Sequence, residues 1–272
     1  MINTGGVELF PRLVASEHRA GFSGAALKSG VAELDSLLGG GIAAGSSTLI
    51  QGPAGTGKSL IIMQFIATSV ARGEKAALFV FDEEIGLLKA RIKAMGIDLQ
   101  AMCDAGNLFI EPMDAAELSP GEFSHRARRL VDEKEVKLVA IDSLNGYQAA
   151  MTEEQHVILH LHELIQYLNR HGVATFITLA QQGMVGEMRQ PVDVTYLADT
   201  VIVLRYFEAM GHVRRALSVM KKRTGGHEAT IREFRIDSKG VFIGPPLEEF
   251  QGVLRGVPIY VGKDSPLLGE RD

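Results

Sequence analysis

One octapeptide has the residue types and the spacing of a phosphate-binding loop. The segment "GPAGTGKS" fits the pattern G-x-x-x-x-G-K-[ST] and lies between an expected strand and an expected helix, a context that argues against a chance match. Its glycines let backbone N–H groups curl around phosphate oxygens, and the helix adds the positive end of its dipole. Lys58 would reach the β- and γ-phosphates, and Ser59 would bind Mg²⁺. The nucleotide-binding residues are therefore predicted to be Gly52, Pro53, Ala54, Gly55, Thr56, Gly57, Lys58, Ser59 and Leu60.

Acidic residues follow two of the expected strands. Asp142 ends the run "KLVAID" and would hold Mg²⁺ through its water shell, unless it only caps a turn. Asp82, Glu83 and Glu84 end the run "FVFDEE", and we expect at least one of them to position the water that attacks a phosphate. The alternative for the two glutamates is that they cap the following helix. All these acids would lie at the carboxyl edge of a parallel sheet, where ligands bind in such folds.

A basic segment, "MKKRTGGHE", follows the apolar run "ALSV" in a chain that is acidic as a whole. In a strand, Lys221 and Arg223 point to the same face, and Lys222 points away. Two interpretations stay open. The segment is either a solvated hairpin tip or a pair of cations that meets a phosphate held by another subunit.

Strands and helices alternate between these chemical groups. Continuous apolar runs predict buried strands over 46–52, 75–81, 107–112, 136–142 and 173–180. Helical patterns cover 31–41, 58–73, 84–96, 119–135 and 152–172. This alternation predicts an α/β fold with a mostly parallel central sheet covered by helices on both faces. Short strands over 200–208, 214–222, 230–236 and 240–244 predict a C-terminal antiparallel extension of that sheet.

Composition limits the class of protein. The 272 residues carry 28 basic and 33 acidic side chains, a net charge of −5, which argues against a general nucleic-acid binder. The single cysteine, Cys103, cannot form an internal disulfide and favours a reducing compartment. We expect neither a signal peptide nor a membrane span, because the most apolar run, "LIIMQFIATSV", is too short to cross a bilayer. A cytoplasmic protein is the expectation.

Six separated motifs together resemble the KaiC-like ATPases of the RecA superfamily. They are "GGGIAAGSSTLIQGPAGTGKS", "FVFDEE", "MGIDL", "VAIDS", "ADTVIVLRYFE" and "MKKRTGGHEATIREFRI", in the family's order. The resemblance implies a RecA-like ATPase that uses ATP and Mg²⁺, assembles into a hexameric ring with ATP between subunits, and meets a regulatory protein partner. It divides the chain into a linker-like arm over 1–22, an ATPase domain over 23–262 and a tail over 263–272. It is most like the second of the family's two tandem domains.

The resemblance also assigns roles to single residues. The family's paired catalytic glutamates fall on Asp82 and Glu83, of which the first is one methylene shorter. Lys221 and Arg223 match the pair that touches the γ-phosphate held by the adjacent subunit, and His227 matches a residue near that neighbour's nucleoside. Thr195 falls on the first autophosphorylation acceptor, and Tyr196 replaces the second, so serine/threonine autokinase activity is an open question.

Three functions compete. The first is a ring-forming ATPase that acts as a slow regulatory switch, and the second is a RecA-like, DNA-dependent ATPase or recombinase. The third is a nucleotide-gated scaffold with negligible turnover. The loops that would face DNA, 142–155 and 181–196, contain one arginine and no lysine, which disfavours the second function. Within the second loop, Gln181 and Gln182 are candidates for sensing the γ-phosphate, with an ordinary turn as the alternative.

Overall fold

The computed structural model describes residues 25–81, 83–116, 119–149, 154–181, 183, 193–237 and 240–262. It also describes two short strands near the N-terminus, β1 (Ile2–Asn3) and β2 (Gly6–Val7), which pair in antiparallel orientation. The rest of the expected arm and the whole of the expected tail lie outside the described residues.

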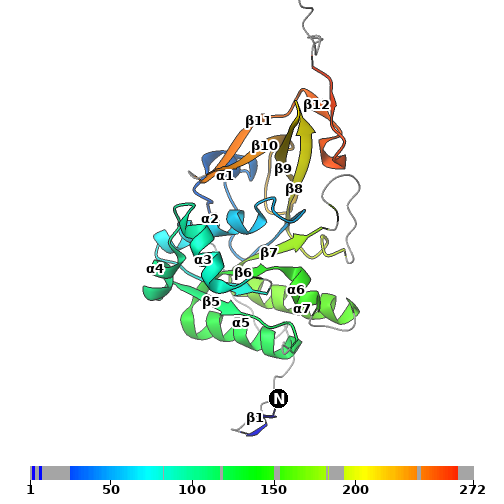
Figure 1. Ribbon diagram of the computed structural model, residues 1–272. Helices are drawn as coiled ribbons and strands as arrows, with labels where there is room; N and C mark the ends of the chain where they lie inside the picture. Colours follow the sequence, from blue (N-terminus) through cyan, green and yellow to red (C-terminus); the bar gives the residue numbers. More distant parts are fainter. Residues whose placement is uncertain are drawn as a thin grey trace, which may run out of the picture.

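A single sheet of nine strands forms the centre of the described structure (Figure 1). Its strands are β3 (Ser47–Gly52), β4 (Lys75–Val80), β5 (Leu108–Pro112), β6 (Val136–Asp142), β7 (Ala174–Ala180), β8 (Thr200–Ala209), β9 (His212–Lys222), β10 (Ile231–Asp237) and β11 (Gly240–Pro246). Their order is β11-β10-β9-β8-β3-β7-β6-β4-β5. The six strands from β8 to β5 run parallel, and β9, β10 and β11 are antiparallel. The prediction of a mostly parallel sheet with an antiparallel extension is confirmed.

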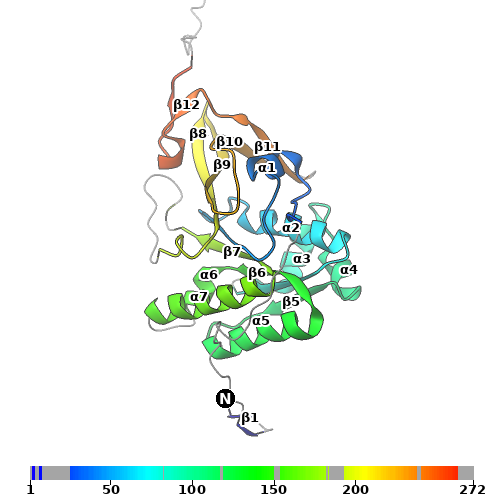
Figure 2. The ribbon, with the colours of Figure 1, turned by 180° about the vertical axis from the view of Figure 1, so that it is seen from behind.

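Helices cover both faces of the parallel part (Figures 1 and 2). They are α1 (Ala32–Leu37), α2 (Lys58–Ala71), α3 (Ile85–Lys93), α4 (Leu99–Asp104), α5 (Pro120–Lys134), α6 (Leu144–Ala149) and α7 (Glu154–Arg170). Residues alternate between two cores along a strand: Ile50 packs with α1–α4, whereas Leu49 packs with α5–α7. Burial on both faces explains why the strands read as unbroken apolar runs. The short helices α4 and α6 are not among the helices expected from the sequence.

The last described residues form a small unit beside β8. It consists of β12 (Phe250–Gln251), the 3₁₀ helix η2 (Val253–Arg255) and β13 (Ile259–Tyr260). Val253 is buried against Phe207 of β8 and Ala216 of β9. None of the described helices has the length and the hydropathy to span a membrane.

Candidate functional site

The phosphate-binding loop connects the end of β3 to the start of α2. Gly55 and Gly57 have φ angles of 75° and 104°, which side chains with a Cβ atom rarely adopt. A Cβ atom on Gly57 would also lie 2.5 Å from Cδ1 of Ile236 in β10. The glycines are therefore required both by the turn and by the antiparallel strand that packs on it.

The lysine of this loop is folded back onto the loop backbone. Its Nζ donates hydrogen bonds to the carbonyl oxygens of Gly52 at 3.0 Å and of Pro53 at 2.7 Å. Thr56 Oγ1 donates to the same Pro53 oxygen at 2.8 Å. Burial lowers the pKa of Lys58 to about 8, and the negative charge of Asp142 opposes part of that decrease. The charge of Lys58 is thus held beside the loop and is only partly compensated.

A cavity of about 440 Å³ opens beside this loop. The loop side of the cavity is formed by Gly55, Gly57, Lys58, Ser59 and Leu60. The other side is formed by Arg91, Ile92 and Met95 at the end of α3, by Arg215 of β9 and by Ile236 of β10. The cavity thus offers polar and charged groups that could contact phosphates, and apolar side chains that could contact the rest of a ligand. The cavity suits a nucleotide.

Asp142 ends β6 at the same edge of the sheet as the loop. Its Oδ1 accepts a hydrogen bond from Thr178 Oγ1 at 2.6 Å, which orients the carboxylate. Ser59, on the first turn of α2, lines the cavity. A carboxylate and a hydroxyl are oxygen ligands of the kind that Mg²⁺ takes, so these two residues fit the ion that the sequence predicts.

The three acids after β4 differ in their surroundings. Glu83 forms a two-bond ion pair with Arg91 of α3, with nitrogen–oxygen distances of 3.1 and 2.7 Å. Glu84 caps α3 by accepting from the backbone N–H groups of Gly86 and Leu87, which lowers its pKa. The capping interpretation is therefore confirmed for Glu84 and not for Glu83. Asp82 lies outside the described residues.

The end of β7 brings a glutamine next to the loop. The backbone N–H of Gln181 donates to Gly52 O at 3.0 Å, and its buried Oε1 has no hydrogen-bond partner in the part of the chain that the structure describes. Asn145 of α6 fixes this strand end by exchanging hydrogen bonds of 3.0 and 2.7 Å with the backbone of Ala180. The second candidate sensor, Gln182, lies outside the described residues.

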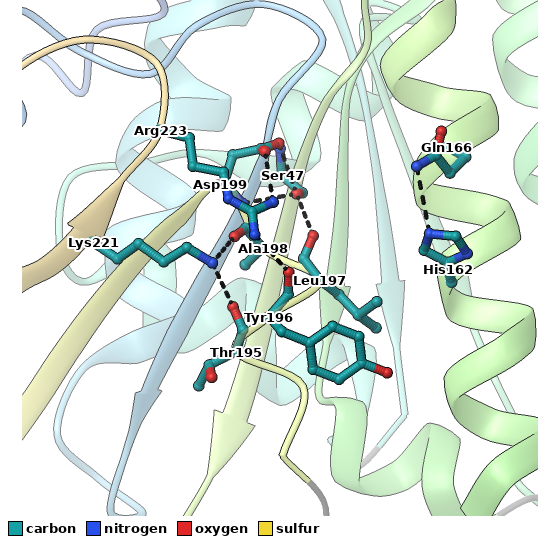
Figure 3. A network of polar contacts seen from close by, with 10 residues as sticks. All are labelled: Ser47, His162, Gln166, Thr195, Tyr196, Leu197, Ala198, Asp199, Lys221 and Arg223. Carbon is teal, nitrogen blue, oxygen red and sulfur yellow. Dashed lines mark hydrogen bonds and ion pairs between the residues drawn. The ribbon is translucent and has the colours of Figure 1, made fainter.

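The basic end of β9 contacts the turn that precedes β8 (Figure 3). Lys221 Nζ donates to the carbonyl oxygens of Thr195 at 2.9 Å and Ala198 at 2.7 Å. Arg223 Nη2 donates to Tyr196 O at 3.1 Å. Lys222 points the other way and donates to Leu38 O, next to α1. The opposite directions agree with the strand periodicity, but both lysines are engaged by the chain itself, so a freely solvated tip is not what the structure shows.

Asp199 fastens that turn to the start of β3 (Figure 3). Its Oδ2 accepts from the backbone N–H and from the hydroxyl of Ser47, both at 3.0 Å. Its Oδ1 lies 3.6 Å from Arg223 Nη1. The turn, β3 and the basic end of β9 are therefore linked through one carboxylate.

The predicted site residues fall into two groups at opposite edges of the sheet. Thr200 pairs with Thr48 at the start of β3, and Lys221 pairs with the neighbouring Val201. The phosphate-binding loop begins at Gly52, at the other end of β3. At ~3.3 Å per residue, Gly52 lies about 13 Å along the strand from Thr48 and about 10 Å from Leu49, which is level with Val201 and Lys221. Asp142, Glu83 and the loop share the carboxyl edge. The other group lies at the amino edge: Thr195, Lys221, Arg223 and, after β9, His227.

Sequence reasoning missed three side chains of these sites. Arg91 and Arg215 line the nucleotide cavity, and Asn145 orients the strand end beside it. In the sequence, Arg91 belongs to an ordinary amphipathic helix and Arg215 to an ordinary strand. Only the packing of α3 and β9 around the loop gives them a role.

Comparison with known proteins agrees with this geometry. A family model described as "ATPase: KaiC" matches residues 27–248. The chain belongs to the KaiC family of ATPases. This family accounts for the RecA-like α/β fold and implies nucleotide binding.

Curated relatives cover nearly the whole chain. The "Circadian clock protein KaiC3" of Synechocystis sp. is 30% identical over 267 residues, which are 97% of this chain and 52% of that protein. A "Circadian clock oscillator protein KaiC" from Parasynechococcus marenigrum is 31% identical over 270 residues, 97% of this chain and 51% of that protein. The chain thus spans about half the length of the curated relatives it matches.

Proposed function

We propose that this KaiC-family chain binds Mg²⁺–ATP in the loop cavity and hydrolyses it. Lys58 and the loop backbone hold the phosphates, and Arg91 and Arg215 border the same cavity. Ser59 and Asp142 would hold the Mg²⁺ ion, which neutralises phosphate charge when it is bound. Asp82 and Glu83 follow β4, the strand that pairs with β6 and its Asp142. They are the candidates for orienting the attacking water.

We propose further that the complete site forms between subunits, in a hexameric ring. The observation that carries this proposal is the separation of the two groups of residues. Lys221 and Arg223 lie toward the amino edge of the sheet, level with Leu49 and Ser47 of β3. At ~3.3 Å per residue these levels are about 10 Å and about 17 Å along the strand from Gly52 of the same chain. If these cations act on a γ-phosphate, the phosphate belongs to another chain. His227 would then lie near the nucleoside of that neighbour.

Autophosphorylation of Thr195 is the second part of the proposal. The hydroxyl of Thr195 donates a 2.7 Å hydrogen bond to the carboxylate of Asp193, an acceptor for the proton that a phosphoryl transfer would release. Lys221, one of the two cations assigned to the neighbour's phosphate, contacts the Thr195 carbonyl. Incubation with Mg²⁺–ATP should add the mass of one phosphate per chain in wild type and none in Thr195→Val.

We propose a regulatory role in which the nucleotide state is the signal to a protein partner. The relatives are named as circadian clock proteins, and a regulatory role of the present chain is our proposal. A stable difference in partner binding between ATP-loaded and ADP-loaded protein would support it.

The central test is ATP turnover of the wild-type protein and of Lys58→Ala, with and without single-stranded DNA. Wild type should hydrolyse ATP at a rate that DNA does not change, and the rate per chain should fall on dilution. Lys58→Ala should lose tight ATP binding, because the charge that meets the β- and γ-phosphates is gone. Unchanged nucleotide affinity in this variant would refute the loop assignment, and DNA-stimulated turnover would favour the recombinase.

A further inference from the structure

A second cavity, of about 310 Å³, lies on the opposite face of the sheet from the nucleotide cavity. Its apolar walls are formed by Val201, Val203, Met220 and Leu254. Its polar lining consists of Gln51, Thr195 and two cations, Arg205 and Lys221. Among the described residues that line it, none is acidic. The cavity therefore combines an apolar surface with uncompensated positive charge.

The two cations are not equivalent. Lys221 is bonded to two carbonyl oxygens. Burial and the neighbouring Arg223 lower its pKa, and Asp199 and Asp193 oppose that decrease. Arg205 has neither kind of support: its Nε and Nη1 atoms are buried and have no hydrogen-bond partner among the described residues. Burial lowers the pKa of the Arg205 guanidinium, and no described carboxylate opposes that decrease.

An acid on the same face, Glu233, is already engaged. Glu233 lies two strands away, because Ala216 of β9 pairs with Arg205 on one side and with Glu233 on the other. The Glu233 carboxylate accepts a 3.0 Å hydrogen bond from Arg214 Nη1. Arg205 is consequently left as a guanidinium that can turn toward the cavity without losing a hydrogen bond to a described residue.

A buried charge without a partner is costly, and proteins normally pair such groups. A guanidinium matches the two oxygens of a carboxylate or a phosphate in shape and charge. We propose that this second cavity binds an oxyanion, a carboxylate or phosphate group, through the guanidinium of Arg205. The apolar walls would accommodate a short hydrocarbon body that carries the anionic group.

Two sources can supply such a group: a small dissolved anion, or an acidic side chain of a neighbouring copy of this chain. Thr195 and Lys221 belong both to this cavity and to the proposed site between subunits. Neither source requires ATP hydrolysis, however, so binding that depends on Arg205 can be tested separately from the proposed function. Inorganic phosphate and succinate are suitable probes for the first source. Self-association of the protein reports on the second.

The first arm uses equilibrium dialysis of labelled phosphate at constant ionic strength, with ADP and Mg²⁺ at saturation to keep the loop cavity occupied. Wild type should bind phosphate, with unlabelled succinate competing, and Arg205→Met should lose at least tenfold in affinity. The matched control is Arg235→Gln, an exposed arginine that pairs with Asp237 and does not line the cavity. Lys58→Ala should keep this phosphate binding although its nucleotide binding is lost, which separates the second cavity from the loop.

The second arm compares the sedimentation of wild type and Arg205→Met at one protein concentration. A shift of the variant to smaller species, without phosphate binding by wild type, assigns the oxyanion to a neighbouring chain. Methionine nearly preserves the volume of the arginine stem and removes the unpaired charge, so the Tm of the variant in phosphate-free buffer should not fall. If neither phosphate or succinate binding nor self-association depends on Arg205, the proposal is overturned.

Discussion

Lys58 is the residue whose environment most directly couples nucleotide binding to pH. In the described structure its ammonium group satisfies carbonyl oxygens of the loop, and burial depresses its pKa to about 8. A bound triphosphate would place several negative charges beside it and raise that pKa again. Binding must therefore exchange hydrogen bonds to the loop for hydrogen bonds to phosphate and, at alkaline pH, must also take up a proton.

The sign of the pH dependence follows from this order of pKa values. Below about pH 7 Lys58 is charged in both states, and ATP affinity should not vary with its titration. At about pH 9 most of the free protein is uncharged at Lys58, so ATP should bind roughly tenfold more weakly than at about pH 7. Calorimetric titrations in buffers of different ionisation enthalpy would count the proton. Pure proton release on binding at alkaline pH would contradict the prediction.

The ion pair between Glu83 and Arg91 leads to a second prediction for single residues, which concerns kcat. Arg91 borders the nucleotide cavity, and its guanidinium occupies both oxygens of a candidate catalytic carboxylate. Arg91→Gln should therefore raise kcat at saturating ATP if Glu83 orients the attacking water, and Glu83→Gln should lower it while ATP still binds.

The matched control for this pair is Lys93→Gln on the same helix. Lys93 is exposed and pairs with Asp98, away from the cavity. Steady-state turnover of all three variants decides the issue. A normal kcat in Glu83→Gln would leave Asp82 as the remaining acid of the pair, and Asp82→Asn should then be the inactive variant.

At the scale of elements, the turn before β8 connects three strands. Asp199 bonds to Ser47 of β3 and lies beside Arg223, and Lys221 holds the same turn through carbonyl oxygens. These hydrogen bonds and ion pairs hold Thr195, Lys221 and Arg223 in place at the amino edge of the sheet. The stability of this turn can therefore be tested separately from catalysis.

Asp199→Ala should lower Tm by roughly 4–8 °C, because the N–H and hydroxyl of Ser47 lose a charged acceptor. Asp199→Asn should lower it by less than half as much, since an amide oxygen can still accept from Ser47. Thermal unfolding monitored by circular dichroism would measure both. Equal shifts in the two variants would show that the charge near Arg223, and not the hydrogen bonds to Ser47, stabilises the turn.

Local signals explain which elements could be predicted. The strands from β3 to β11 each carry a continuous or alternating apolar pattern, and α2, α3, α5 and α7 are long enough to show a helical period. The helices α1, α4 and α6 have 6 residues each, which is short for a visible period, and α1 was expected because its pattern ends in three glycines. The strands β12 and β13 have 2 residues each and are defined mainly by packing against the end of β8.

The site residues likewise divide into those with a local sequence signal and those defined only by packing. The loop, Asp142 and the acids after β4 could be located because each follows a strand directly in sequence. The partner of Glu83 could not, because Arg91 is brought to it by the orientation of α3. The contacts of Lys221 and Arg223 join residues more than 20 positions apart, which no spacing rule describes.

At the scale of the whole molecule, the separation of the two groups makes mixtures of variants informative. Lys58→Ala should be unable to hold ATP, and Arg223→Ala should hold it without completing the neighbour's site; an arginine supplied by another chain contributes ~10³–10⁵ in rate in comparable enzymes. Mixing the two inactive proteins should restore part of the wild-type turnover, because some contacts then join an intact loop to an intact arginine.

The control for this mixture is Lys222→Ala, whose side chain faces Leu38 and not the turn before β8. It should stay close to wild type. Mass spectrometry would show that mixed assemblies form. A mixture that assembles and stays inactive, or a Lys222→Ala protein as inactive as Arg223→Ala, would contradict the role proposed for Arg223.

The position of the loop and the basic strand end at opposite edges of one sheet also gives the molecule a polarity. A twofold contact centred on either edge would bring like to like, two loops or two basic ends, and would complete no site. Only head-to-tail addition joins unlike edges, and an open row built in this way always ends with one unmatched loop and one unmatched basic end. Closure of the row into a ring removes both ends at once. The copy that closes the ring forms two contacts, whereas each earlier addition forms one.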